Sequence, residues 1–356
     1  SGLIYNFASR LCRLAGAAFC SRDWELHQAL LCGIISKYEC TGCTHALQYS
    51  TREGLFLTVL RYIVPPEADC QRLEIFLRTQ GVTAALIKSV KYNGDGFFAD
   101  GAPLHTDQPV HPGQQISFAL PPELPTSVTP QPVPFAIAYE DEFAAVLEKP
   151  AGIAVHPTLN YPDGTLANGW LYHLQQQGKT GVFRPVNRID KNTSGLVLCA
   201  QNSFAAPLLA DSAQKCYLAI VQGILPLGPG QVEAPIARRG DSIIGRCVRE
   251  DGKYSLTRYN VLGVGTGHSL VACTPCTGRT HQIRVHMAYI GHPLAGDTLY
   301  GGSDSILSRH ALHCAVLRFT HPVSRQAIRI QSELPPDMAA LAHSEGLFNN
   351  WDLQEL

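Results

Sequence analysis

The pattern of apolar and polar residues predicts a buried strand directly after a polar turn. Residues 196–200, LVLCA, form a continuous apolar run, and the polar residues 192–195 precede them. A short apolar run bounded by turn residues is typical of a buried strand. Asp190 lies just before this turn. The pattern therefore predicts a carboxylate where a loop enters the core, which is where a rigid scaffold presents reactive groups.

Two further segments predict strands. In KCYLAIVQG, residues 215–223, alternation places Lys215, Tyr217 and Ala219 on one face and apolar residues on the other. HALHCAVLRF, residues 310–319, begins with polar residues and ends as a strand. From residue 135 onward such β-rich runs alternate with turns and a few helical segments, which predicts an α+β domain with a mixed or antiparallel sheet over 135–335.

The N-terminal part of the chain predicts a smaller unit. RLEIFLRTQ (72–80) and TAALIKSVKY (83–92) have helical patterns split at Gly81, and a glycine-rich turn and strand-like segments follow up to residue 120. We expect a small α/β domain over 54–120. Six prolines in the fourteen residues 121–134 predict a linker. Residues 1–50 form an extension of unknown role, and residues 336–356 form an acidic C-terminal tail.

Composition indicates an ordinary soluble globular protein. The chain has 356 residues, is 45% hydrophobic, and lacks a run of about 18 apolar residues that could span a bilayer. Arg10 and Arg13 interrupt the apolar N-terminus, so we expect no signal peptide, no membrane contact and a cytoplasmic location. Twelve cysteines spread over a long chain favour reduced thiols. Cys40 and Cys43 form a lone CxxC, which without a second pair is a weak signal for zinc.

Charge is distributed unevenly along the chain. Residues 184–330 hold 16 Lys and Arg against 8 Asp and Glu, whereas residues 1–183 and 331–356 are each net acidic. The segment around Asp190 is therefore the basic one, which suits a polyanionic partner. Solvated charge spread over several faces is the alternative, because an excess over a segment need not lie on one surface.

Polar residues concentrate in four segments of the large domain. Asp190 stands between Arg188 and Lys191 in RPVNRIDKNTSG, where it could react or could cap the turn and pair with Arg188. EKPAGIAVHP, residues 148–157, places Lys149 and His156 around a Pro-Ala-Gly turn. The other two segments are the strand that carries Tyr217 and TGRTHQIRVHMAYIGHPLAGDTLYGG, residues 277–302.

These segments, in this order, resemble the signatures of the RluA-type pseudouridine synthases. That family has a KPAG..VHP turn, an R-L-D-x-x-T-S-G loop, a K-x-Y-x-A-x-V-x-G strand and a TGRTHQIRVH…GHP..GD..YG segment. The resemblance covers about residues 135–335. The unit at 54–120 resembles the small RNA-binding domain, first described in a ribosomal protein of the small subunit, that often precedes this catalytic domain. Its second helix offers only Lys88 and Lys91, fewer basic residues than usual.

The resemblance implies an isomerase that converts uridine in structured RNA, ribosomal or transfer, to pseudouridine. The N1–C1′ bond breaks, the uracil turns, and C5 joins C1′, so no cofactor and no metal is expected. RNA is the expected partner, and the protein should act as a monomer without an obligatory protein partner. A relative that binds RNA without catalysing the reaction is the alternative.

The resemblance also assigns roles to individual residues. Asp190 matches the essential aspartate, which could attack C1′ or C6 or take a proton from C2′. Arg284 matches the basic residue that pairs with it, and Tyr217 the tyrosine that stacks on the base. Leu312 would pack on the other side of the base, and Arg188 would fill the gap left by the extruded uridine or grip the flanking phosphate. The remaining substrate-binding candidates are Lys215, Arg279, His281, Lys149 and His156.

Two features depart from this picture. Asn187 and Ile189 stand where many family members have His and Leu, and neither change touches the aspartate, so we expect activity to be kept. Cys273, Cys276, His281 and His286 have a spacing close to that of a zinc knuckle that binds single-stranded nucleic acid. Ile283 and Val285 alternate with polar residues there, which predicts a strand rather than a free-standing zinc module.

Overall fold

A computed structural model of the chain describes residues 48–52, 55–123 and 126–347. These residues divide into two compact units. The first holds the described residues up to Leu73 and the segment Val90–Pro121, and the second holds Glu74–Ser89 and the chain from Pro122 onward. The predicted linker at 121–134 begins at this division, and the polar segments singled out above all lie in the second unit.

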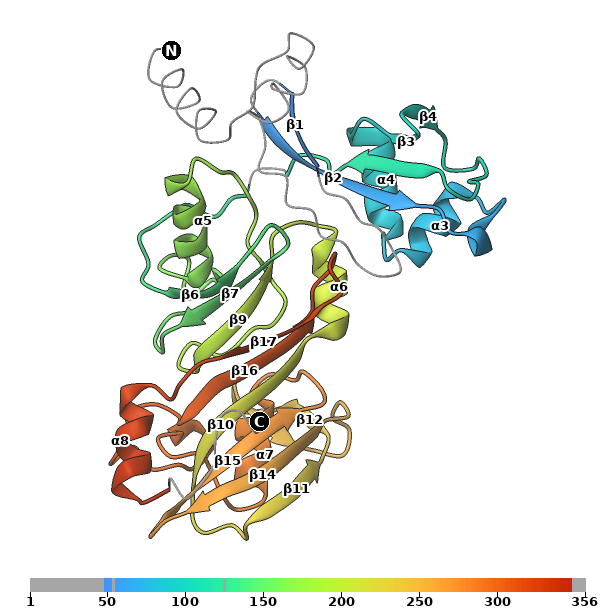
Figure 1. The fold of residues 1–356 in the computed structure, drawn as a ribbon. Helices are drawn as coiled ribbons and strands as arrows, with labels where there is room; N and C mark the ends of the chain where they lie inside the picture. Colours follow the sequence, from blue (N-terminus) through green and yellow to red (C-terminus); the bar gives the residue numbers. More distant parts are fainter. Residues whose placement is uncertain (1–47, 53–54, 124–125, 348–356) are drawn as a thin grey trace, which may run out of the picture. The chain divides into compact units, whose positions relative to one another are not determined.

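The first unit is built on a five-stranded antiparallel sheet in the order β1-β2-β5-β3-β4 (Figure 1). Its strands are β1 (Gln48–Arg52), β2 (Leu55–Ile63), β3 (Phe97–Ala99), β4 (Ala102–Leu104) and β5 (Gln115–Ala119). Aromatic rings from three strands pack on one face, where the Phe118 centroid lies 6.2 Å from that of Tyr62 and 5.2 Å from that of Phe97. All three are buried, so this face forms the core of the sheet.

Two short helices, most of whose residues belong to the second unit, confirm the helical patterns at 72–80 and 83–92. They are α3 (Leu73–Thr79) and α4 (Ala84–Asn93), and the 3-10 helix η1 (Pro66–Ala68) precedes them. Gly81 separates them with φ of 85°, a left-handed conformation that favours glycine. Each helix buries apolar side chains, among them Phe76 and Val90.

The second unit is built on a ten-stranded mixed sheet, which confirms the predicted α+β class. Its path runs β11-β14-β15-β10-β16-β9-β7-β6, with β17 beside β16 and β8 beside β9. The strands are β6 (Ala136–Glu140), β7 (Ala144–Lys149), β8 (Arg184–Pro185), β9 (Ser194–Ala200), β10 (Gln214–Gln222), β11 (Gly228–Glu233), β14 (Leu256–Val264), β15 (His268–Pro275), β16 (Leu312–Thr320) and β17 (Ala327–Gln331). Among the described strands only β9 and β16 pair in parallel, and they join the two halves of the sheet.

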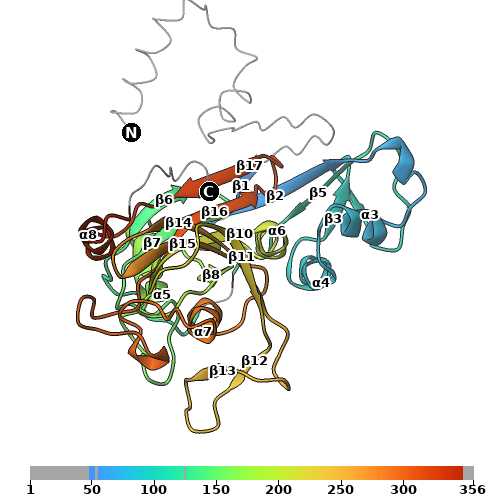
Figure 2. The same ribbon diagram turned by 90° about the horizontal axis from the view of Figure 1, so that it is seen from below.

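Helices flank this sheet, and a small hairpin extends from it (Figure 2). The helices are α5 (Leu166–Gln176), α6 (Ala205–Ser212), α7 (Gln282–Tyr289), α8 (Pro336–Ser344) and the 3-10 helix η2 (Thr298–Tyr300). The hairpin pairs β12 (Ile236–Arg238) with β13 (Arg246–Val248). Contacts of α7 with β13, β14, β15 and η2 tie it to the half of the sheet that contains β10.

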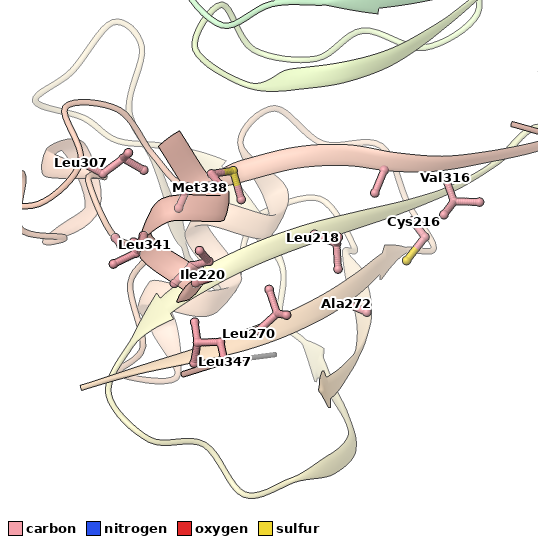
Figure 3. Packing of buried hydrophobic residues seen from close by; sticks show 14 residues of the cluster. Cys216, Leu218, Ile220, Leu270, Ala272, Leu307, Val316, Met338, Leu341 and Leu347 are labelled. Carbon is pink, nitrogen blue, oxygen red and sulfur yellow. The ribbon is translucent and has the colours of Figure 1, made fainter. Parts of the chain in front are cut away.

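The core of this half lies on one face of β10. Leu218 and Ile220 pack there with Leu270 of β15 and with Met338 and Leu341 of α8 (Figure 3). Because side chains alternate along a strand, Tyr217 lies on the opposite face of β10. This opposite face is also covered, since Tyr217 is 7% exposed. Alternation along 215–223 therefore reflects two buried faces rather than one buried and one solvated face.

The interpretation of residues 283–290 as a strand is wrong. These residues belong mainly to helix α7, and its residues from Gln282 to Met287 are all buried. A helix that is buried all round has no polar face, so its sequence lacks the 3.6-residue contrast between apolar and polar positions. The alternating β-branched Ile283 and Val285 then imitate a strand.

Two segments outside the sheets were interpreted from their composition, a linker at 121–134 and an acidic tail at 336–356. The described residues between Pro121 and Phe135 form neither helix nor strand, and two of them bond to Asn168 of α5. The predicted acidic tail begins with α8, whose Met338 and Leu341 join the core. Cys40 and Cys43 lie outside the described residues. Within the described part of the chain, the helices are too short or too polar to cross a bilayer.

Candidate active site

Asp190 lies in the loop between β8 and β9, at the entrance to the core. The backbone N–H of Thr193 donates to the Asp190 carbonyl at 3.1 Å and closes a turn, after which all seven residues of β9 are buried. The Asp190 side chain is 27% exposed, so its carboxylate is sheltered but accessible. The loop thus holds an accessible carboxylate against a rigid strand.

Gly195 allows the two halves of the sheet to meet beside this turn. It has φ of 106°, and a Cβ there would lie 2.3 Å from the carbonyl oxygen of Cys314. Cys314 is its partner in the parallel pairing of β9 with β16. A side chain would therefore push β16 away from the turn that carries Asp190.

The guanidinium of Arg284 bridges two carboxylates. Its Nη1 donates to Asp190 Oδ2 at 2.9 Å, while Nε and Nη2 donate to the two oxygens of Asp297 at 2.8 Å each. The side chains of Arg284 and Asp297 are 8% and 1% exposed, so water screens this pair little. Burial alone would lower the pKa of Arg284, but bonding to Asp297 and then to Asp190 raises it, and the group stays cationic.

His281 approaches the same oxygen from the N-terminus of α7. Its Nε2 lies 3.7 Å from Asp190 Oδ2, and its Nδ1 lies 2.7 Å from the hydroxyl of Tyr300. The backbone of His281 has φ of 58°, which is uncommon for a residue other than glycine and clusters at functional sites. Burial lowers the pKa of His281 against the opposing charge of Asp190, so the ring is neutral at neutral pH.

Lys149 ties the Pro-Ala-Gly turn to the loop of Asp190. Its Nζ donates to the carbonyls of Pro150 and Lys191 at 2.8 and 2.9 Å, and the side chain is fully buried. The N–H of Gly152 also donates to the Lys191 carbonyl, at 2.9 Å. Burial lowers the pKa of Lys149 to about 7, with the charge of Arg309 adding to the shift and that of Asp190 opposing it.

Tyr217 of β10 faces the site from the sheet. Burial raises its pKa well above the ordinary value, and the charges of Cys314 and Asp190 act in the same direction. The phenol is therefore protonated at neutral pH. The register pairs Tyr217 with Cys314 and Ala219 with Leu312, so Leu312 lies on the same face of the sheet as Tyr217.

Two buried histidines hold the turn after Asp190 to β16. His310 Nε2 lies 2.8 Å from Thr193 Oγ1, and His313 Nδ1 lies 2.9 Å from Ser194 Oγ. Burial lowers the pKa of both to about 4, so neither carries charge at neutral pH. The polar start of HALHCA is visible in the sequence, but local pattern predicts no role for these two histidines.

The other predicted site residues lie around this centre. Arg188 is exposed, and its charge adds to the burial that lowers the pKa of His156, so these two groups are neighbours. Lys215 is half-buried near the start of β10. Arg279 is exposed, and its Nε donates to the Tyr254 carbonyl at 3.2 Å. The described partner of the Asp190 carboxylate is Arg284 and not Arg188, so the alternative of a turn cap paired with Arg188 is not formed.

Three of the four side chains of the zinc-knuckle alternative, Cys276, His281 and His286, bond to other groups. Both ring nitrogens of His286 are engaged, Nδ1 with Thr257 Oγ1 at 2.9 Å and Nε2 with the Ala234 carbonyl at 3.0 Å. Cys273 is fully buried in β15, and burial raises the pKa of its thiol. His286 thus has no free ring nitrogen, and burial disfavours the Cys273 thiolate that a zinc knuckle would require.

Two site residues were missed by the sequence analysis. Asp297 binds Arg284, and Tyr300 bonds to His281 while its ring centroid lies 5.0 Å from the Arg284 guanidinium. Both come from the GD..YG part of the quoted signature, which was the available signal. With Tyr300 included, six groups near Asp190 have pKa values that respond to its charge, namely Lys149, Tyr217, His281, Arg284, Tyr300 and His310.

This arrangement presents one accessible carboxylate beside a fixed cation and a buried aromatic ring. A carboxylate is ionised at neutral pH, so it can act as a nucleophile or accept a proton. The ring of Tyr217 offers a flat apolar surface beside it, and Arg188 supplies an exposed positive charge nearby. The site therefore suits chemistry on a planar base carried by a polyanion.

Comparison with known proteins identifies this chemistry. A family model described as RNA pseudouridylate synthase matches residues 144–289. The "Uncharacterized RNA pseudouridine synthase YjbO" of Bacillus subtilis (strain 168) is 38% identical over 272 residues, which are 74% of this chain and 96% of that protein. The "Ribosomal large subunit pseudouridine synthase D" of Xanthomonas campestris pv. campestris is 36% identical over 314 residues, which are 81% of this chain and 93% of that protein.

Solved structures include the human RNA Pseudouridylate Synthase Domain Containing 1, which is 24% identical and has a TM-score of 0.48 over 65% of this chain and 100% of that chain. The relatives named above exceed 30% identity over most of both sequences. The chain therefore belongs to the RluA family of RNA pseudouridine synthases and is an intramolecular isomerase that acts on RNA.

Proposed function

We propose that this synthase isomerises uridines of large-subunit ribosomal RNA and that Asp190 is its reacting carboxylate. The assignment of Asp190 rests on its contact with the buried Arg284 at 2.9 Å. The choice of large-subunit ribosomal RNA is supported by relatives named ribosomal large subunit pseudouridine synthase D, including those of Xylella fastidiosa and Pseudomonas aeruginosa. Transfer RNA is the competing substrate.

The reaction leaves the atomic composition of the RNA unchanged. The N1–C1′ bond of uridine breaks, the freed uracil turns, and a C5–C1′ bond forms. C5 then loses its proton, and N1 gains one. Asp190 could form a transient bond to C1′ or C6 that is later broken, or remove and return the C2′ proton. All three routes need an ionised carboxylate.

Arg284 and Tyr217 supply the surroundings that these routes require. A bidentate or fixed guanidinium keeps a neighbouring carboxylate charged and oriented. The buried ring of Tyr217 can stack on the uracil, and Leu312, on the same face of the sheet, can cover its other side. The phenol also offers a group for the proton transfers at C5 and N1.

Lys149 has a positioning role in this proposal rather than the substrate contact predicted from the sequence. Its ammonium is buried and donates to the carbonyls of Pro150 and Lys191. Those bonds connect the Pro-Ala-Gly turn to the backbone next to Asp190 and so hold that backbone in place. The RNA backbone is left to exposed groups such as Arg188 and Arg279, with His156 beside Arg188.

Arg188 has a second task in a folded substrate. A uridine must leave its helix to reach Asp190, and a long cationic side chain at the rim can fill the vacated space or hold the flanking phosphate. Residues 184–330 carry 16 Lys and Arg against 8 Asp and Glu, which favours binding of a polyanion.

A complementation experiment tests the proposal. Pseudouridines are mapped in ribosomal and transfer RNA from cells that lack the gene and from the same cells supplied with wild-type protein, Asp190→Ala or Asp211→Ala. Asp211 is an exposed control on α6. We expect a large-subunit position to lose its pseudouridine and to regain it with wild type and with the control only. Losses confined to transfer RNA would refute the ribosomal substrate, and rescue by Asp190→Ala would refute the role of Asp190.

A further inference from the structure

Asp297 is a buried carboxylate that the proposed chemistry does not use. Its side chain is 1% exposed, at the start of the 3-10 helix η2. Removing a carboxylate from water is costly unless it is paired and hydrogen-bonded. The buried position of Asp297 is therefore explained by its pairing with Arg284.

Asp297 takes one whole edge of the Arg284 guanidinium. Its two oxygens accept from Nε and Nη2 at 2.8 Å each, a parallel two-bond contact that fixes the plane of the group. Only Nη1 is directed to Asp190. An arginine without this partner could rotate and meet Asp190 with either edge.

The charges of the three groups set how firmly Asp190 is held. One positive charge, that of Arg284, lies between two carboxylates, and both Arg284 and the neutral ring of His281 approach Oδ2 of Asp190. If Arg284 gave both nitrogens to Asp190, both carboxylate oxygens would be engaged. Because Asp297 occupies the other edge, Arg284 engages only one of the two oxygens of Asp190, and the carboxylate keeps an oxygen for the substrate.

The turn that carries Asp297 is itself rigid. The N–H groups of Tyr300 and Gly302 donate to the Asp297 carbonyl at 3.0 and 2.8 Å. A Cβ on Gly302 would lie 2.0 Å from the Leu294 carbonyl oxygen, so the chain passes here with no room for a side chain. Tyr300 closes over the arginine, with its ring centroid 5.0 Å from the guanidinium carbon.

We propose that Asp297 is a positioning residue for pseudouridine formation, which holds Arg284 so that Nη1 alone meets the carboxylate of Asp190. The proposal rests on the proposed role of Asp190. It differs from a purely structural ion pair in one respect: Asp297 acts on the reaction only through Arg284. A structural pair would affect folding, and its effect on turnover would not depend on which group stands at position 284.

A double-mutant cycle on the purified full-length protein distinguishes these roles. The substrate is a large-subunit rRNA transcript with tritium at C5 of uridine, because the reaction releases that hydrogen. Rates and half-saturating RNA concentrations are measured for wild type, Asp297→Asn, Arg284→Gln and the double variant. Asp141→Asn is the control, since Asp141 is a half-buried carboxylate that pairs with His321 and bonds to backbone N–H groups at the β6–β7 turn.

We expect Asp297→Asn to lower kcat about 30-fold with the half-saturating RNA concentration changed less than about 3-fold. In the Arg284→Gln background it should change kcat less than about 3-fold, and Asp141→Asn should leave kcat near wild type. A wild-type kcat in folded Asp297→Asn, or effects that multiply in the double variant, would overturn the proposal.

A second variant covers the case in which Asp297→Asn does not fold. Asp297→Glu keeps the charge but moves the carboxylate by one methylene, so it should also lower kcat without weakening RNA binding. Unchanged kcat in that variant would refute the proposal. Asp190→Ala is assayed in the same series: turnover by that variant would refute the role of Asp190, whereas the coupling of Asp297 to Arg284 is measured independently.

Discussion

Arg284 and Asp190 lie 94 residues apart in the chain, yet Nη1 of the arginine donates to Oδ2 of the aspartate over 2.9 Å. The aspartate comes from the loop before β9, and the arginine from the first turn of helix α7. Two rigid elements from different parts of the sequence therefore meet in one ion pair. The Arg284 side chain is 8% exposed, so water screens the ion pair little and the guanidinium has few alternative positions.

Arg284→Lys should slow pseudouridine formation about 100-fold. Lysine keeps the charge, but its single nitrogen cannot reproduce both the two parallel bonds to Asp297 and the third bond to Asp190. A small displacement of a positioned group is enough for a loss of this size. The exposed Arg258→Lys in β14 is the control and should retain its rate. Equal rates for the two variants would show that charge alone suffices at position 284.

Tyr217→Phe should separate the ring of this residue from its hydroxyl. The ring is kept, so RNA affinity should stay within about 3-fold, while loss of a proton-transfer group should reduce turnover about 100-fold. Tyr217→Leu should weaken both. The exposed Tyr289→Phe on α7 serves as the control. If Tyr217→Phe turned over at the wild-type rate, the hydroxyl would have no part in the reaction.

Lys149 should make stability depend on pH in a defined direction. Burial lowers its pKa to about 7 in the folded protein, against an ordinary value of 10.5. Between these values the unfolded chain binds a proton that the folded protein has lost, so this residue makes the free energy of unfolding rise with pH and fall again as pH drops toward 7.

Urea unfolding of wild type and Lys149→Met tests this sign. The free energy of unfolding of wild type minus that of the variant should increase by roughly 2 kcal/mol from about pH 6 to about pH 9. Lys179→Met, at an exposed position, should give a difference independent of pH. A pH-independent difference for Lys149→Met as well would mean that the buried amine keeps an ordinary pKa.

Gly195→Ala should destabilise the catalytic domain by at least about 2 kcal/mol and reduce activity in the folded fraction. A positive φ is unfavourable for alanine, and its Cβ would lie 2.3 Å from the Cys314 carbonyl oxygen. Gly240→Ala, where a Cβ meets nothing within 4 Å, is the matched control. Thermal unfolding gives the comparison, and equal melting temperatures for the two variants would contradict the close approach of β9 and β16.

The sequence predicted elements best where one pattern dominated. The apolar run at 196–200 became β9, and the periodic segments at 72–80 and 83–92 became α3 and α4. Helix α7 was misinterpreted because tertiary burial on all sides removed its amphipathic signal. A continuous apolar run therefore predicted a buried strand correctly, whereas local pattern did not distinguish a buried helix without amphipathic contrast from a strand.

The candidate site was predictable as a set of residues but not as a geometry. Motif resemblance named Asp190, Tyr217 and Arg284, yet nothing local indicates that Arg284 has a second carboxylate partner. The partnerships of Thr193 with His310 and of Ser194 with His313 span more than a hundred residues. Such contacts follow from the parallel pairing of β9 with β16, which sequence periodicity does not encode.

The most direct test of the central claim is product formation by purified Asp190→Ala on large-subunit ribosomal RNA, measured over a time long enough for many wild-type turnovers. RNA affinity and the melting temperature are measured on the same sample. We predict no detectable pseudouridine, with RNA affinity and melting temperature close to those of wild type, because the carboxylate reacts but does not hold the fold. Pseudouridine formation by this variant at a measurable rate would contradict the claim that Asp190 carries out the isomerisation.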